Sequence, residues 1–96
     1  MNIDDLQINF PDLCAKYGVK KLEIFGSFAR GDAGDSSDLD LIVQFDGLIG
    51  LVDRFFGLKN DLEHLTHRSV DILPNKPFKN PIFARNVNRE RRVVYG

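Results

Sequence analysis

The sequence predicts an α/β (α+β) fold, in which one small mixed β-sheet carries helices packed against it. Two observations predict this class. Short segments with alternating apolar side chains, typical of strands, are interleaved with segments of helical period. Clusters of turn-forming residues separate these segments. A length of 96 residues is enough for one modest core, so we expect a single domain over residues 1–96.

The first half of the chain predicts a helix, a strand and a long turn. Asn9 is a suitable helix N-cap, Pro11 fits the first helical turn, and Gly18 fits the position after the last turn. Residues 20–25 predict a strand because apolar side chains recur at every second position. The turn formers of residues 26–37 end that strand abruptly.

The second half of the chain predicts three further strands and two further helices. The strands are expected over residues 38–45, 69–73 and 91–95, and the helices over residues 48–65 and 81–88. The first of these strands alternates most regularly, with apolar side chains on one face and acids on the other. The first helix has apolar residues at positions 48, 51, 52, 55, 58, 62 and 65, which is a helical period.

The composition is that of an ordinary soluble globular protein, with 43% apolar and 28% charged residues. The single cysteine, Cys14, excludes an internal disulfide and fits a reducing cytoplasm. The first ten residues lack a basic segment followed by an apolar run, which argues against a signal peptide. No stretch approaches the ~20 apolar residues of a membrane span. We therefore expect a cytoplasmic protein without membrane contact.

The net charge of −1 is unevenly distributed along the chain. Residues 1–75 contain 7 Lys/Arg and 13 Asp/Glu, whereas residues 76–96 contain 6 Lys/Arg and 1 Glu. A basic C-terminal segment on an acidic body indicates a patch for phosphates or for an acidic partner. A solvated helix face is the alternative, and the sequence leaves both open.

Gly26 and Ser27 stand where the first strand ends and a turn or short helix begins. A glycine there lets a ligand approach the main chain closely. Free N–H groups at a helix start attract phosphate oxygens, and the serine hydroxyl adds a donor. Alone this is a weak signal, because Gly-Ser before a turn is common.

Three aspartates form the stronger signal. Asp38 and Asp40 lie two residues apart on a strand, so both carboxylates face the same side. Such a pair repels unless a cation lies between its members, and carboxylate oxygens suit Mg²⁺ or Mn²⁺. Asp71 is a third acid, within a short apolar strand. If the two strands are neighbours, three carboxylates converge and can hold two divalent ions.

These residues together resemble the DNA polymerase β-like nucleotidyltransferase superfamily. Its signature is Gly-Ser, ten residues, and Asp-x-Asp, followed by a later aspartate in a strand. The string GSFARGDAGDSSDLDLIVQF is most similar to the smallest branch, the minimal nucleotidyltransferase (MNT) domains. The resemblance covers nearly the whole chain. The sequence departs from the pattern at Phe28, where many relatives have a basic residue, and in the turn around Arg68.

The resemblance implies a role for each site residue. Gly26 and Ser27 would bind the triphosphate of ATP or another nucleoside triphosphate. Asp38, Asp40 and Asp71 would hold two Mg²⁺ ions, and Asp71 would help to deprotonate the acceptor hydroxyl. That oxygen would displace pyrophosphate from the α-phosphorus in line. Arg30 would steady either the turn or a phosphate, and the sequence does not decide between these roles.

The MNT branch also implies a partner. Its members are antitoxins of HEPN-domain RNase toxins, so we expect AMP transfer from ATP to a tyrosine of a cognate HEPN toxin, without direct nucleic-acid binding. One alternative is a non-catalytic antitoxin or nucleotide-binding subunit that neutralises its partner by binding alone. Three repelling carboxylates argue against a pure binder. A second alternative, transfer to a small molecule or an RNA end, lacks a second domain to close over such a substrate.

Overall fold

The computed structural model describes residues 9–96. The predictions of a single domain and of no signal peptide also concern residues 1–8, which lie outside the described residues. The described elements follow the predicted order. They are α2 (Phe10–Tyr17), β1 (Val19–Phe25), α3 (Ser27–Arg30), β2 (Leu39–Phe45), α4 (Leu51–Thr66), β3 (Val70–Pro74), α5 (Pro81–Glu90) and β4 (Arg92–Tyr95). Within residues 9–96, no helix has the length and apolar character needed to cross a membrane.

Most element bounds lie within one or two residues of the prediction. The differences at the starts of α4 and β2 have local causes. The expected helix over residues 48–65 begins only at Leu51, because Gly50 takes a left-handed conformation with φ 67°. The strand expected from Asp38 begins at Leu39, whose N–H donates to the carbonyl of Ser69 at 3.0 Å. Asp38 therefore precedes the sheet ladder.

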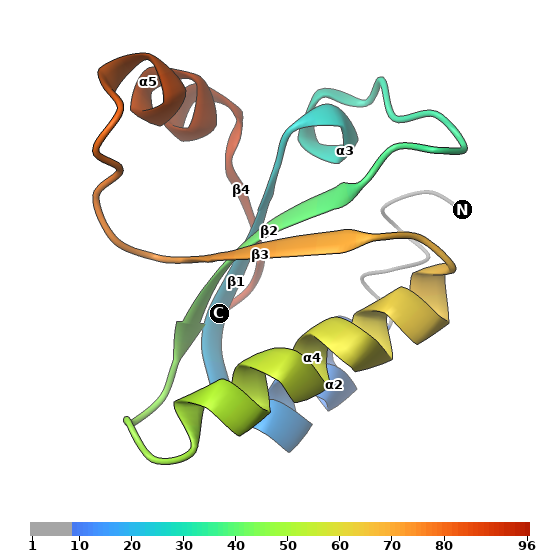
Figure 1. The fold of residues 1–96 in the computed structure, drawn as a ribbon, viewed down its shortest axis with the longest axis vertical. Coiled ribbons are helices and arrows are strands. Elements are labelled where there is room, and N and C mark those ends of the chain that lie inside the picture. Colours follow the sequence, from blue (N-terminus) through green and yellow to red (C-terminus); the bar gives the residue numbers. More distant parts are fainter. Residues whose placement is uncertain (1–8) are drawn as a thin grey trace.

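The four strands form one mixed sheet in the order β3-β2-β1-β4 (Figure 1), which confirms the predicted architecture. β1 is antiparallel to both β2 and β4. β2 and β3 are parallel, and α4 is the helix that connects them. This parallel pair gives the site its geometry, because residues at paired positions leave the sheet on the same face.

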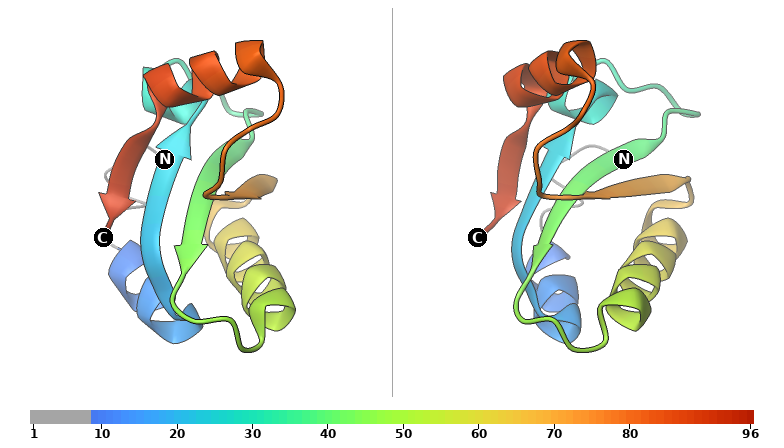
Figure 2. Two further views of the ribbon diagram at one scale, coloured as in Figure 1. Left: turned by 90° about the vertical axis from the view of Figure 1, so that its left-hand side faces the viewer. Right: turned by 60° about the vertical axis from the view of Figure 1, so that its left-hand side comes forward.

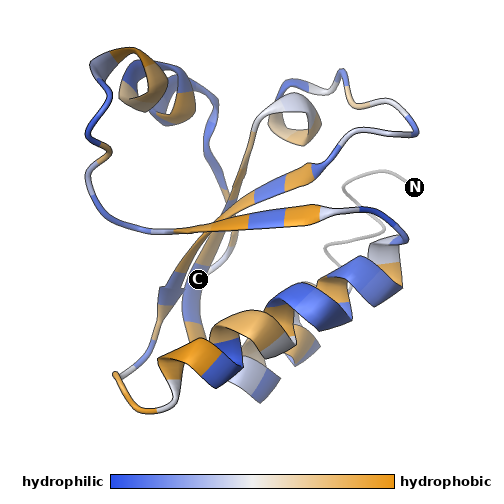
Figure 3. Ribbon diagram, in the orientation of Figure 1, coloured by the Kyte–Doolittle hydropathy of each residue, from blue (hydrophilic) through white to orange (hydrophobic). Residues whose placement is uncertain are grey.

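The main core lies between one face of the sheet and the helices α2 and α4. Alternate residues of the strands face it, so apolar and polar colours alternate at the starts of β2 and β3 in Figure 3. Its fully buried members are Phe10, Cys14, Leu22, Leu39, Leu41, Leu58 and Leu62. Burial raises the pKa of the Cys14 thiol to about 11, which makes this cysteine an unreactive core residue.

The opposite face carries a smaller apolar cluster under α5. Phe25 and Ile42 pack there with Val87 of α5. Figure 2 shows α5 beside the end of β1 at which α3 begins, whereas α2 and α4 lie toward the other end. The residue after α5, Arg91, forms an ion pair with the buried Glu23 of β1, and its Nε donates to Oε1 at 3.2 Å.

Arg54 of α4 joins three segments at the end of the sheet away from α5. Its guanidinium donates to the carbonyl oxygens of Tyr17 and Gly18 at 2.9 Å each, and to that of Asp46 at 2.6 Å. It also donates to the carbonyl of Ile49 and lies over the ring of Phe45. One side chain thus satisfies four main-chain acceptors, at the end of α2 and in the β2–α4 loop.

We therefore predict that Arg54→Met lowers the free energy of unfolding by about 2–3 kcal/mol, because several carbonyl groups lose a charged donor at once. Chemical denaturation measures the change. Arg85→Met removes an exposed arginine from α5 and is the matched control, with an expected effect within about 0.5 kcal/mol. Equal effects of the two substitutions would contradict this role for Arg54.

Candidate functional site

Asp40 and Asp71 lie at paired positions of the parallel strands β2 and β3. Their side chains therefore leave the sheet on one face and next to each other. Asp38 is two residues before Asp40 and is exposed, as is Asp71, while Asp40 is half-buried. The structure thus brings the three predicted aspartates to the same end of the sheet.

The charges of these aspartates act on one another. The pKa of Asp40 is raised above its ordinary value, first by burial and then by the negative charges of Asp71 and Asp38. Arg30 acts in the opposite direction, and Glu90 adds to the upward shift. The site is therefore an acidic cluster whose central carboxylate is costly to ionise without an added cation.

The donors suit a hard divalent cation, since all three side chains offer carboxylate oxygens. Among residues 9–96, however, no three His, Cys, Asp or Glu side chains are gathered closely enough to hold a metal ion. The aspartates share a neighbourhood without a ready-made coordination shell. Mutual repulsion is a physical reason for this, because uncompensated carboxylates are most stable apart.

Gly26 lies against Asp40 and has a conformation that favours glycine, with φ 74° and ψ −151°. A Cβ atom on Gly26 would collide with Oδ2 of Asp40. Two independent constraints therefore require glycine here. Its N–H donates to Oε2 of Glu90 at 3.1 Å, so this N–H is already occupied.

Ser27 and Arg30 are the first and last residues of α3. The Ser27 carbonyl accepts hydrogen bonds from the N–H groups of Gly31 and Asp32, both at 3.0 Å, which closes the turn. The Arg30 side chain donates through Nε to Asp32 and through Nη1 to Glu90, each at 3.1 Å. The structure thus shows Arg30 steadying this turn, while nucleotide contacts of Gly26, Ser27 and Arg30 stay predictions.

Sequence reasoning missed two residues of this region. Arg68 lies with its guanidinium 4.7 Å from the ring centroid of Phe28, and its Nη1 donates to the carbonyl of Ser37 at 2.7 Å. It therefore holds the loop that leads into Asp38. Phe28 and Arg68 are the positions at which the sequence departs from the MNT pattern, and they contact each other. The second missed residue, Glu90, is the only acid in the basic C-terminal segment.

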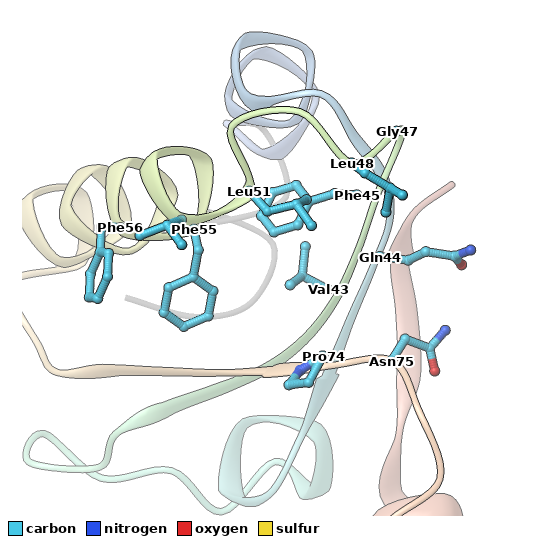
Figure 4. A pocket seen from close by; sticks show the side chains of 11 residues that line it. Val43, Gln44, Phe45, Gly47, Leu48, Leu51, Phe55, Phe56, Pro74 and Asn75 are labelled. Atoms are coloured by element: carbon cyan, nitrogen blue, oxygen red, sulfur yellow. The ribbon is translucent and has the colours of Figure 1, made fainter.

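A separate hollow in the described part of the protein lies away from the acidic site. It is an apolar groove of about 550 Å³ at the other end of β2, beside the start of α4 (Figure 4). Phe55 and Val43 point into it in Figure 4, and the exposed Leu48 and Phe56 lie along it. None of the six predicted site residues lines this groove. Its apolar character does not suit a triphosphate.

Comparison with known proteins gives one matching family model, the nucleotidyltransferase domain, over residues 10–94. The protein adenylyltransferase MntA of Thermococcus cleftensis is 37% identical over 84 residues, which are 88% of this chain and 81% of that protein. A solved structure described as a candidate minimal nucleotidyltransferase has a TM-score of 0.74 at 35% identity, with coverage of 96% of this chain and 95% of its own.

Two further solved structures share the fold at lower identity. One is a toxin–antitoxin complex with AMP-PNP, with a TM-score of 0.70 at 18% identity and coverage of 94% of this chain and 73% of that one. The other is a tri-AMPylated HEPN toxin of Shewanella oneidensis in complex with MNT antitoxin. Its TM-score is 0.62 at 16% identity, with coverage of 94% and 69%.

We predict that Asp40→Asn stabilises the ligand-free protein near neutral pH, because it removes an ionised group whose pKa folding raises. The cost of ionised Asp40 is absent below its unfolded pKa and complete above its folded pKa. The gain should therefore disappear as the pH falls below the ordinary value of 3.8. Thermal melts across this range measure it, with the exposed Asp53→Asn as the control. A variant less stable than the wild type at neutral pH would contradict the electrostatic account.

Proposed function

Since the chain belongs to the nucleotidyltransferase domain family, we propose that it transfers AMP from ATP, with Mg²⁺, to a tyrosine hydroxyl of a cognate HEPN toxin. In this way it acts as the antitoxin. One observation carries the proposal: Asp40 and Asp71 lie at paired strand positions, directly beside the Gly26–Ser27 turn. Acids for a metal and a turn for phosphates thus meet at one place.

This geometry supports a role for each of these side chains. Asp38, Asp40 and Asp71 would hold Mg²⁺, which when bound supplies positive charge for the triphosphate and the leaving pyrophosphate. Ser27 and Arg30 would contact phosphate oxygens at the start and end of α3. The N–H of Gly26 is already bonded to Glu90, so the role of Gly26 is to leave room beside Asp40.

Asp71 is exposed and adjacent to Asp40, which supports a role in acting on the acceptor. Its carboxylate would take the proton of the tyrosine hydroxyl as the oxygen attacks the α-phosphorus of ATP. A bond forms between that oxygen and phosphorus, and the bond to the β-phosphate oxygen breaks. The products are a tyrosine carrying AMP and free pyrophosphate.

The relatives support the choice of acceptor. MntA of Thermococcus cleftensis is named a protein adenylyltransferase, and the Shewanella oneidensis complex contains an AMPylated HEPN toxin. A protein acceptor also suits the size of the chain, since residues 9–96 form no second wall over the exposed Asp71. A docked partner can supply this wall and its own tyrosine. The added AMP brings bulk and a negative charge to the toxin.

We predict that Asp40→Asn and Asp71→Asn each lower AMP transfer by about a hundredfold or more, because several kcal/mol of transition-state stabilisation are lost. The assay incubates the protein with labelled ATP, Mg²⁺ and a candidate HEPN-domain toxin. Label is followed on the partner. Asp53→Asn, an exposed acid of α4, is the matched control and should transfer at the wild-type rate.

Two results would contradict the transfer proposal. If both site variants label the partner at the wild-type rate, these aspartates do not serve the reaction. If the wild type binds and neutralises the partner without labelling it, the chain neutralises by binding alone. Removing Mg²⁺ with EDTA should abolish labelling in the wild type.

The basic C-terminal segment provides the candidate docking surface. Arg85 and Arg89 of α5 and Arg92 of β4 are exposed, whereas Arg91 is paired with Glu23 and is not available. Exposed positive charges beside an acidic site attract an acidic partner surface and raise the association rate. The α5 helix lies at the same end of the molecule as α3, so a partner docked there faces the site (Figure 1).

We predict that reversing Arg85, Arg89 and Arg92 to Glu slows association with the partner by about tenfold at low salt and makes it less salt-sensitive. Stopped-flow association at two ionic strengths measures both effects. The control reverses Lys16, Lys20 and Lys21, an equal change in net charge at the other end of the sheet. Equal slowing by both triple variants would refute a specific docking role, and loss of Mg·ATP binding would place the arginines in the nucleotide site.

A further inference from the structure

Glu90 makes contacts that link the helix α5 to the turn around α3, where we place the nucleotide. Both its carboxylate oxygens accept from Nη1 of Arg30 at 3.1 Å, and Oε2 also accepts from the N–H of Gly26 at 3.1 Å. The partners are 60 and 64 residues away in the sequence. The Glu90 side chain is only 17% exposed, whereas that of Arg30 is 47% exposed. The contact thus holds the guanidinium of an otherwise accessible arginine.

The position of Glu90 is electrostatically unfavourable in two ways. It is the last residue of α5, where the partial negative charge of the helix end disfavours an acid. It also adds negative charge beside Asp40, which already lies near Asp71 and Asp38. The bonds to Arg30 and Gly26 offset these costs. A carboxylate held in this place therefore calls for an explanation beyond surface solubility.

The effect of the contact on Arg30 supplies that explanation. Nε of Arg30 is held by Asp32 and Nη1 by Glu90. Among the described residues, Nη2 has no hydrogen-bond partner. A guanidinium held at two nitrogens is pre-oriented, so little side-chain entropy remains to be lost when the third binds an anion. A single lysine nitrogen could not divide its contacts in this way.

We propose that Glu90 is a positioning residue of the nucleotide site, which holds Arg30 so that its free Nη2 is available to the triphosphate. This inference rests on the proposed nucleotide transfer. The competing interpretation has the opposite sign. In it, the Glu90 carboxylate occupies phosphate-binding donors, and ATP must displace it.

The affinity for Mg²⁺ with a non-hydrolysable ATP analogue distinguishes these interpretations, and calorimetry on the full chain measures it. Glu90→Gln should weaken binding by about tenfold, because an amide loses the charge and places a donor against Arg30. Arg30→Met should weaken it at least as much. In the double variant, Glu90→Gln should cost nothing further, since it acts through Arg30.

Glu23→Gln is the matched control. It breaks a different ion pair near the end of α5, that of Arg91 with Glu23 of β1, and does not touch Arg30 or Gly26. All measurements are made well below the melting temperature of each variant. If Glu23→Gln weakens binding as much as Glu90→Gln, the effect is a general loosening of α5 and the proposal is overturned. An affinity of Glu23→Gln within about twofold of that of the wild type supports the proposal.

Unchanged or tighter binding by Glu90→Gln overturns the proposal, and tighter binding establishes the competing interpretation. Additive losses in the double variant also overturn it. If Glu90→Gln does not fold, Arg30→Lys tests the same contact, because one ammonium cannot serve both Glu90 and a phosphate. Its affinity should fall about tenfold, and wild-type affinity would refute the proposal. A wild type that binds no Mg²⁺ and analogue fails at the earlier step, the proposed function itself.

Discussion

Asp40 and Asp71 lie opposite each other in the parallel pair β2–β3, and the rest of the site depends on this pairing. Parallel pairing places both carboxylates on the same face of the sheet, and a shift by one residue would send one of them into the apolar core. Leu39, Leu41 and Ile72 prevent such a shift, because they fill the core from the opposite face. Apolar packing on one side of the sheet therefore fixes the charge geometry on the other.

This arrangement has a cost, which the surrounding residues limit without removing. The pKa of Asp40 stays raised, so the site favours uptake of a proton or a cation. Gly26 lets the turn lie against Asp40, and Arg30 brings the nearest compensating charge. Arg30 is in turn held by Asp32 and Glu90. Three acids and an arginine thus lie at one end of the sheet, where under the proposed function they would serve a cation and phosphates.

The sequence predicted the element order, the sheet class and the three aspartates because these depend on local patterns. Alternation in residues 38–45 and turn formers in residues 26–37 act over a few positions. It could not predict the contacts of Glu90 and Arg68, since these join segments about 60 and 30 residues apart through the tertiary fold. The predicted start of α4 is too early because the apolar Leu48 continues the helical period. The left-handed conformation of Gly50 delays the helix until Leu51.

The contacts that stabilise the fold and the residues of the proposed site lie at opposite ends of the sheet. Arg54 joins α2, the β2–α4 loop and α4 at one end, next to the apolar groove. The acids, Gly26 and Arg30 gather at the other end, where α3 and α5 lie (Figure 2). The main core lies between the sheet and the helices α2 and α4. Under the proposed function, a cation and a partner would therefore relieve the repulsion at the charged end without disturbing the packing that holds the sheet together.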